Sequence, residues 1–497
     1  MKKYTAILLL CAMLASLGAC GAEAPAADTT APADTTAAPV VDTVGNGREF
    51  TEDSLPETMD FGGITLTVLT RAGDAAVKGE FIAEEETGDI VNDAVWARNM
   101  KVEERLNVKI DTVETEQNRH LHANDLIKQS ILAGSDDFDI IANHLGRTVL
   151  LALDGLFKNL NTMPHLDLDQ PWWNQSYTEM TGLEGKLYSI TGELSQTMVS
   201  GTYAMFFNRT MFEDVFPKEP SLYETVNSGK WTLDKMMSYT SALYNDVNGN
   251  AAPDEGDRFG FFFTNAKCLG SDAFVGGCNI QLLKQDGDEI KFNGSGAEVV
   301  TYFEKMNQLL FRDNNTLRAP YNDETVMTSM NKGQVMFTTW MLTAADYLRD
   351  MKDDFGIVPM PKLDDTQKEY SATAHNGCSV FAIPVTCKDS DAAAALLEAL
   401  GAETYRKVTP AYFEVALKVK YSRDDETAQM LDLIVDSVKL DLATVFGQKL
   451  GGPTDWFRDI VNSSAGCESA ISTLASRETS IMSGMDNVKA QYKALEG

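Results

Sequence analysis

The chain has 497 residues, of which 44% are hydrophobic and 23% are charged, and its formal net charge is -31. A surface this acidic repels the phosphates of nucleic acids and of anionic lipids, so neither is expected as a partner. The length exceeds what one hydrophobic core usually supports, so more than one lobe or domain is expected.

Residues 1–19 have the order of a secretory signal peptide. Lys2 and Lys3 precede an apolar stretch from Ala6 to Leu17, which is shorter than the roughly 20 residues of a membrane-spanning helix. The segment Leu17 to Cys20 resembles the bacterial lipobox, in which the cysteine is acylated and becomes the first residue of the mature chain. The alternative is an ordinary signal peptide with an incidental cysteine. The lipobox interpretation predicts a lipid anchor at Cys20.

Residues 20–59 are predicted to be a lipid-anchored, disordered linker. From Gly21 to Asn46 the sequence consists almost entirely of Ala, Pro, Thr, Asp and Val. This composition offers too little bulky apolar surface to offset the entropy of ordering. Lipid and linker together predict a body held at the extracytoplasmic face of the bacterial cell membrane.

The first part of the body predicts alternating strands and helices. Apolar residues alternate over 64–69 as in a β-strand, and 108–113 and 138–142 are two further predicted strands. Between these strands, 92–106 and 122–133 carry apolar residues at helical spacing. This order indicates a parallel sheet with covering helices.

Similar signals continue toward the C-terminus. We predict strands at 204–207 and 259–263, and helices at 233–244, 297–311, 392–400 and over the last forty residues. No internal repeat is visible. The fold class is therefore predicted to be α/β in more than one lobe.

Motifs of common enzyme and metal chemistry are absent from the sequence. It contains no nucleophile elbow, zincin motif, phosphate-binding loop or dinucleotide fingerprint, and its cysteines form no Cys-x-x-Cys pair. Carboxylates are abundant, but a glycosidase pair is recognised only by its separation in space. Cys268 and Cys278 are either a short disulfide loop or buried free thiols. No enzymatic activity and no required cofactor are predicted.

Six short stretches, read together, resemble a known family. They are ETGDIVNDA (86–94), GKLY (185–188), YAMFFNR (203–209), GKWT (229–232), NKGQVMF (331–337) and FGIVPMPK (355–362). In this order they resemble the family 1 extracellular solute-binding proteins, which include the maltodextrin-binding proteins. They span nearly the whole body.

The resemblance implies the two-lobed, type II periplasmic-binding-protein fold, in which lobes joined by three crossing segments close on a ligand. Lobe one would comprise 60–192 and 381–440, and lobe two would comprise 193–375 and 445–497. The crossings would lie near Thr191 to Ser200, His375 to Phe381 and Leu440 to Phe446. The resemblance further implies a monomeric receptor that delivers a mono- or oligosaccharide to the permease subunits of an ABC importer.

We chose candidate ligand-binding residues by their position in the sequence and by the chemistry of sugar-binding sites. Such sites pair aromatic platforms with planar polar side chains. The resemblance implies Trp340 and Trp456 as stacking platforms, against the alternative that each is a core or surface residue. The other candidates are Trp173 in an unusual Trp doublet; Asn143, His144 and Arg147 after a predicted strand; and Thr202, Tyr203 and Asn376 at the crossings. Helix capping and surface pairing are the alternative roles for the loop residues.

One further constellation resembles an EF-hand calcium loop. Asp246, Asn248, Asn250, Asp254 and Asp257 place oxygen atoms at positions 1, 3, 5, 9 and 12 of that template. The glycine is at position 4 rather than 6, and the last ligand is an aspartate where a glutamate is expected. The alternative is an Asx-rich turn without metal. We predict a structural calcium site.

The leading hypothesis from the sequence is therefore a solute-binding receptor for a carbohydrate. One rival is a lipid-anchored surface protein that binds or senses glycans without a transporter. A second rival is a lipid-anchored glycoside hydrolase, which would cleave the oligosaccharide that it binds.

Acylation of Cys20 is directly testable. Replacing Cys20 with Ala removes the only thiol at the predicted cleavage site, so the protein should move from the membrane fraction to the medium or remain an uncleaved precursor. Fractionation of cells followed by immunoblotting measures this. Processed protein that still fractionates with the membrane would exclude the lipid anchor.

Overall fold

The computed structural model describes residues 47–71, 79–115, 119–251, 254, 256–264, 269–287, 289–313, 315–319, 323–413 and 425–495. The predicted signal peptide, Cys20, most of the predicted linker and Cys268 lie outside these residues. The chain divides into two units, Met1–Thr43 and Val44–Gly497, and all elements below belong to the second.

Four strands form the first sheet, in the order β11-β3-β1-β2. They are β1 (Ile64–Arg71), β2 (Val108–Thr115), β3 (Ile140–His144) and β11 (Ser379–Ala382). β1 runs parallel to β2 and β3, which confirms the predicted parallel sheet. β11 comes from far along the chain and pairs antiparallel with β3, and the local pattern did not indicate it.

Five strands form the second sheet, in the order β10-β4-β9-β5-β8. They are β4 (Tyr203–Asn208), β5 (Phe259–Thr264), β8 (Thr316–Ala319), β9 (Val335–Met341) and β10 (Phe355–Val358). Every residue of β4 and β5 is buried, as expected for strands covered on both faces. A separate hairpin joins β6 (Leu283–Asp286) and β7 (Glu289–Phe292).

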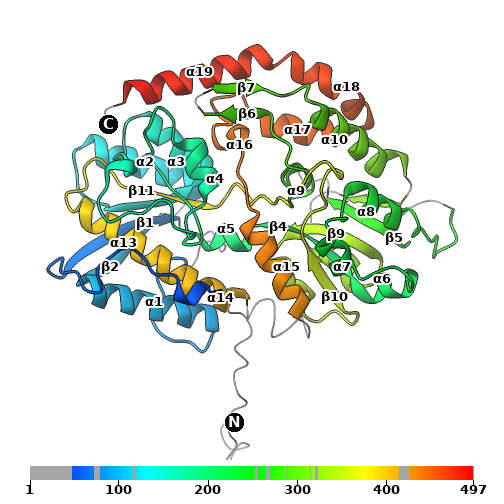
Figure 1. The fold of residues 1–497 in the computed structure, drawn as a ribbon, viewed down its shortest axis with the longest axis horizontal. Coiled ribbons are helices and arrows are strands. Elements are labelled where there is room, and N and C mark those ends of the chain that lie inside the picture. Colours follow the sequence, from blue (N-terminus) through cyan, green and yellow to red (C-terminus); the bar gives the residue numbers. More distant parts are fainter. Residues whose placement is uncertain are drawn as a thin grey trace, which may run out of the picture. The chain divides into compact units, whose positions relative to one another are not determined.

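Helices surround the two sheets, and Figure 1 labels most of them. The predicted helices are α1 (Ile90–Leu106), α2 (Arg119–Leu132), α8 (Leu233–Thr240), α10 (Ala297–Asn307), α13 (Ser390–Glu403), α17 (Pro453–Val461), α18 (Ser464–Ala475) and α19 (Glu478–Ala494). The others are η1 (Arg48–Phe50), α3 (Leu145–Leu153), η2 (Leu160–Thr162), α4 (Gln175–Thr181), α5 (Gln196–Ser200), α6 (Arg209–Val215), α7 (Leu222–Asn227), α9 (Leu269–Gly277), η3 (Gln308–Arg312), α11 (Asp323–Asn331), α12 (Ala344–Leu348), η4 (Thr404–Val408), α14 (Thr409–Tyr412), α15 (Asp425–Asp436) and α16 (Leu442–Val445). None of the helices in the described part of the chain has the length and apolarity needed to span a bilayer.

Side chains that cap the start of α1 explain the sequence of the motif over 86–94. Asp89 caps α1 by accepting hydrogen bonds from the backbone N–H groups of Val91 and Asn92, at 3.1 and 3.0 Å. Asp93 accepts from the amides of Thr87 and Gly88, and Gly88 has φ 82°, which favours glycine. The motif over 86–94 therefore encodes a helix start.

Three segments run side by side between the sheets; we call them the first (190–202), second (372–381) and third (437–446) crossing segments. Ile190 and Phe381 exchange backbone hydrogen bonds of 2.9 and 2.7 Å, and His375 N–H donates to Gly201 O at 2.9 Å. Ala372 N–H donates to Ser437 O at 3.1 Å, and its carbonyl accepts from Lys439 N–H at 2.9 Å. The second segment is thus bonded to both of the others.

We call the part of the body around the first sheet the first-sheet half, and the part around the second sheet the second-sheet half. Two helices contact the half to which their predicted lobe does not correspond. α15 lies within the range predicted for lobe one, yet its buried residues Met430, Leu431 and Ile434 face β10 and α7 of the second-sheet half. α19 lies within the range predicted for lobe two, yet it contacts α3, and the Lys186 ammonium donates to the carbonyl of Tyr492 at 3.2 Å. The predicted lobe boundaries stay a prediction.

Candidate functional site

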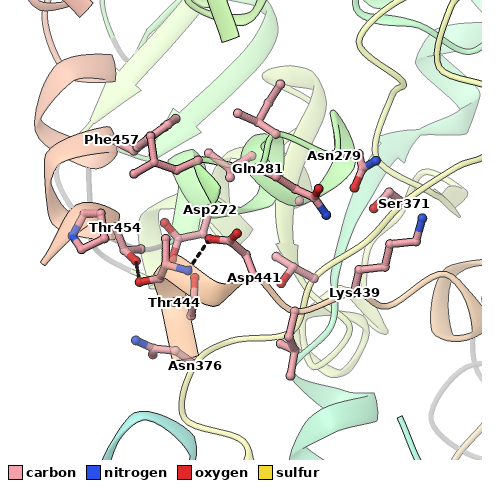
Figure 2. Close-up of a pocket in the computed structure, with 18 of the residues that line it drawn as sticks. Asp272, Asn279, Gln281, Ser371, Asn376, Lys439, Asp441, Thr444, Thr454 and Phe457 are labelled. Carbon is pink, nitrogen blue, oxygen red and sulfur yellow. Dashed lines mark hydrogen bonds between the residues drawn. The ribbon is translucent and has the colours of Figure 1, made fainter. Parts of the chain in front are cut away.

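A small pocket lies where the second and third crossing segments meet α9 and α17; we call it the inner pocket. Its volume is about 60 Å³. Figure 2 shows its side chains arriving from four separate parts of the chain. They are Asp272, Val275, Gly276, Asn279, Ile280, Gln281 and Leu282; Ser371, Thr373, Ala374 and Asn376; Lys439, Leu440, Asp441, Ala443 and Thr444; and Pro453, Thr454 and Phe457.

Several polar groups of the inner pocket have no protein partner. The side-chain amides of Asn279, Gln281 and Asn376 donate and accept no hydrogen bond among the described residues. The Ser371 hydroxyl is buried and likewise has no hydrogen-bond partner in the described part of the chain. Because buried polar groups are normally paired, these groups suit a ligand that supplies donors and acceptors.

Two adjacent glycines bring α9 close to the second crossing segment. A Cβ atom on Gly276 would lie 2.5 Å from Thr373 Cγ2, and one on Gly277 would lie 2.3 Å from Met360 Cβ. Asn279 follows with φ 50°, a left-handed conformation that asparagine tolerates better than most residues. The sequence Gly-Gly-Cys-Asn therefore places the Asn279 amide at the pocket wall.

Carboxylates of the inner pocket have different surroundings. Asp441 caps α16 by accepting from Ala443 N–H at 3.0 Å, and burial raises the pKa of this carboxyl to about 7. Asp272 is instead bound by the Arg458 guanidinium, with Nε 2.9 Å and Nη2 2.5 Å from its two oxygens. This bidentate pair joins α9 to α17 and neutralises the negative charge of Asp272.

The inner pocket adjoins a larger space that reaches both halves of the molecule; we call it the outer hollow. Its volume is about 590 Å³, and it shares Gln281, Lys439, Leu440 and Asp441 with the inner pocket. Its remaining walls are Ser176, Glu179, Met180 and Gly182 in and after α4, Leu283, Gln285 and Gly287 around β6, and Leu442. A ligand in the two spaces would touch both halves.

A third cavity, of about 320 Å³, lies between the first crossing segment and the end of α15. Trp173 contributes to its wall, but the Trp173 ring is only 2% exposed and donates its Nε1–H to Glu398 at 3.1 Å. Trp173 is thus mainly a core residue of the first-sheet half. Among the predicted ligand residues, Asn376 is the one that lines the inner pocket.

The three candidates predicted in the loop after a strand make protein contacts; Asn143 and His144 are the last residues of β3, and Arg147 lies in α3. Asn143 is fully buried and donates from its side chain to the Asn124 side-chain oxygen at 2.8 Å. His144 is the N-cap residue of α3. Arg147 donates to the Gln448 side-chain oxygen at 3.0 Å. None of the three lines the inner pocket, the outer hollow or the third cavity.

Thr202, Tyr203 and Trp340 are buried in this arrangement, and a ligand-binding role for them stays a prediction. Thr202 is 0% exposed and donates its hydroxyl to Met198 O at 2.6 Å. Tyr203 and Trp340 are 1% and 2% exposed and pack in the apolar core around β4 and β9. Both strands are central in the second sheet, which encloses their side chains on both faces.

Trp456 lies on α17 but does not line the inner pocket, to which its neighbour Phe457 contributes. The Arg477 guanidinium lies 4.8 Å from the centre of the Trp456 ring. A platform role for Trp456 stays a prediction.

The predicted calcium loop is a network of hydrogen bonds around its carboxylates. Asp246 accepts from the backbone N–H groups of Gly249 and Ala251 at 2.6 and 2.8 Å. Asn248 and Asn250 donate their side-chain amides to Asp254. The Asn248 side-chain oxygen accepts from the backbone N–H of Asn250 at 3.0 Å.

Sequence reasoning missed most of the inner pocket. Asn279, Gln281, Ser371 and Asp441 follow no motif of the kind that marks sugar-binding sites. The Gly276-Gly277 pair ahead of Asn279 is the one local signal of a close backbone approach. Cys278, which was considered as a disulfide partner, is a buried free thiol.

Comparison with known proteins gives a result at the level of fold. No protein-family model and no curated protein sequence matches the chain. Among solved structures, the cyclic α-maltosyl-1,6-maltose binding protein from Arthrobacter globiformis is similar with a TM-score of 0.58 at 15% identity, covering 86% of this chain and 100% of that chain.

Two further structures are similar. The galacto-N-biose-/lacto-N-biose I-binding protein of an ABC transporter from Bifidobacterium longum has a TM-score of 0.54 at 12% identity, over 86% of this chain and 98% of its own. UgpB from Mycobacterium tuberculosis, solved with glycerophosphocholine, has a TM-score of 0.54 at 14% identity, over 85% and 98%. These likenesses confirm the predicted two-lobed α/β fold of solute-binding proteins.

The buried Glu398 predicts a pH-dependent stability. Glu398 is 0% exposed, and burial raises its pKa from 4.5 to about 7. Between these values the folded protein keeps a proton that the unfolded chain has lost, so the free energy of unfolding should fall as pH rises from about 4.5 to about 7. Glu398→Gln keeps an acceptor for Trp173 and should reduce this fall.

Urea unfolding of both proteins at several pH values across this window measures the effect. Glu478→Gln, at the exposed start of α19, is the control and should leave the pH dependence unchanged. An equal pH dependence in Glu398→Gln and the unsubstituted protein would show that Glu398 keeps an ordinary pKa.

Proposed function

We propose that the protein is a solute-binding receptor that captures a carbohydrate between its two lobes and delivers it to an ABC importer. One observation carries the proposal. Amide and hydroxyl groups that have no protein partner in the described part of the chain line the inner pocket, and this pocket adjoins a hollow walled by both halves. A ligand held from both sides stabilises the closed arrangement, which is what a capture receptor requires.

The chemistry of the inner pocket favours a hydroxylated ligand. Among the described residues, the lining groups without a protein partner include planar amides, a hydroxyl and the Lys439 ammonium, and all of these can form hydrogen bonds with sugar hydroxyls. Arginine is absent from the lining of this pocket in the described residues, and Asp272 is already paired with Arg458. Phe457 supplies an apolar surface for a sugar face. The solved proteins of similar fold include two whose names state that they bind saccharides.

The sequence supports the rest of the proposal. The lipobox-like segment supports acylation at Cys20 and attachment to the extracytoplasmic face of the cell membrane. The similar protein from Bifidobacterium longum belongs to an ABC transporter, which supports permease subunits as partners. The similar proteins are named as binding proteins, which supports capture without catalysis and without a required cofactor. The lobes would have the boundaries predicted from the family motifs, except that α15 would move with the second-sheet half, which it contacts.

Ligand titration tests the proposal. We expect cyclic α-maltosyl-1,6-maltose, lacto-N-biose or another member of a mono- and oligosaccharide panel to raise the unfolding temperature, because a ligand that binds only the native state stabilises it. Asn376→Ala should weaken binding about three- to tenfold, the usual effect of losing one hydrogen bond. Its unfolding temperature should be unchanged, since the amide bonds to no described residue.

Asn462→Ala is a matched control, because Asn462 is exposed at the end of α17 and lines neither space. Glycerophosphocholine is the non-saccharide probe and should not bind. Failure of the whole saccharide panel at millimolar concentration would exclude the carbohydrate receptor. Release of cleaved products from a bound oligosaccharide would favour the glycoside hydrolase instead.

We further propose that the loop from Asp246 to Asp257 binds calcium for structural reasons. The spacing of its oxygen side chains supports this, and Asp257 anchors the loop because it is 1% exposed and accepts from Val247 N–H at 3.0 Å. Calcium should raise the unfolding temperature of chelator-treated protein, and Asp254→Asn should abolish that increase. Magnesium at equal concentration controls for ionic strength. An unfolding temperature that calcium does not change would identify the loop as a metal-free turn.

A further inference from the structure

Arg48 lies at the N-terminal edge of the body, where it is 5% exposed. Its guanidinium binds both carboxylate oxygens of Glu193, at 2.6 and 2.8 Å, and it reaches an Asp436 oxygen at 3.1 Å. The same group stacks over the Tyr405 ring, 4.3 Å from its centre. One buried cation therefore joins the first crossing segment, η4 and the end of α15.

The segment that carries Arg48 is fixed to the first-sheet half. Asp53 accepts from Arg105 of α1 at 2.9 and 2.7 Å, and from Arg406 of η4 at 2.7 Å. The side chain of Asp53 is 2% exposed, so these ion pairs are shielded from water. Arg48 therefore moves with the first-sheet half.

Asp436 belongs structurally to the other half. It is the last residue of α15, whose buried face packs on β10 and α7, and Thr427 of this helix shares a hydrogen bond of 3.0 Å with Tyr223 of α7. In Figure 1, α15 lies beside α7 and β10 of the second-sheet half. The pair between Arg48 and Asp436 thus spans the two halves beside the third cavity, whose lining shares Lys439 with the inner pocket.

We propose that Arg48 is a latch between the lobes, and that its ion pair with Asp436 stabilises the arrangement of the two halves seen here. The inference rests on the proposed function, because a latch acts only where lobes move. Arg48 binds Glu193 of the first crossing segment and Asp436, which directly precedes the third, so movement of these two segments relative to each other would change the distance between Arg48 and Asp436. Glu193 and Asp436 both line the third cavity, so unfilled space rather than packed side chains lies beside the latch.

Asp436 is the better residue to substitute. Removing Arg48 leaves the buried Glu193 carboxylate without its partner, which destabilises the fold whatever the role of the latch. The Asp436 side chain is 64% exposed, so Asp436→Asn removes the charge attraction across the halves with little effect on folding. Asp234→Asn is the matched control, because Asp234 is 65% exposed and pairs at 2.7 Å with Lys305 inside one half.

Distances between nitroxide labels at Lys109→Cys on β2 and Glu213→Cys on α6, two exposed positions in opposite halves, report the arrangement of the halves. Cys278, Cys378, Cys387 and Cys467 are buried, and the chain without introduced cysteines gives the labelling background. Without ligand, Asp436→Asn should change the ratio of present to displaced arrangements about two- to fivefold, the range expected for a partly exposed ion pair. Asp234→Asn should match the unsubstituted distribution.

The outcomes separate the latch from a merely structural ion pair. A changed distribution in Asp436→Asn alone, with an unfolding temperature equal to that of Asp234→Asn, supports the latch. An unchanged distribution in Asp436→Asn, or equal changes in both variants, overturns it. Addition of lacto-N-biose and cyclic α-maltosyl-1,6-maltose to the unsubstituted protein tests the proposed function separately, because a saccharide that shifts its distances upholds the receptor even where the latch fails.

Discussion

Backbone hydrogen bonds among the three crossing segments join the two sheets, and Ser379 lies at the centre of this joint. Its N–H donates to the Ser195 hydroxyl at 3.0 Å, and its carbonyl accepts from the Thr191 hydroxyl at 2.7 Å. Its hydroxyl donates to Glu80 at 2.8 Å and accepts from Arg71 at 3.0 Å. Every polar atom of this buried serine is used, so the first and second segments are held together where they enter the first sheet.

The same joint explains where the inner pocket lies. The second segment bonds to the first through Gly201 and His375, and to the third through Ala372. Ser371 and Asn376 lie next to these contacts in the sequence and line the inner pocket, which α9 also lines. The inner pocket is lined by segments that link the two sheets. A change in the arrangement of the halves would therefore change the contacts that the pocket offers to a ligand.

Charge is distributed unevenly between the pocket and the rest of the body. Three arginines of the body form ion pairs with carboxylates that are largely shielded from water: Arg48 with Glu193, Arg458 with Asp272, and Arg406 with Asp53. Such pairs contribute modestly to stability because both ions lose hydration, but they fix the geometry of the segments that carry them. Among the described residues, the lining of the inner pocket keeps amides, a hydroxyl and the Lys439 ammonium without protein partners, although the whole chain is strongly acidic.

The sequence by itself determined the elements whose signals are local: the alternation of β1 and β2, the helical spacing of α1 and the α/β class. The crossings came from the resemblance to a family and stay a prediction. The sequence did not determine β11, which pairs with β3 across more than two hundred residues, or the burial of Trp340 on a central strand. Only the tertiary structure decided that Asn279, Gln281 and Ser371 share one pocket. The physical reason is that a pocket is assembled from distant segments, and the direction in which a side chain points depends on what packs behind it.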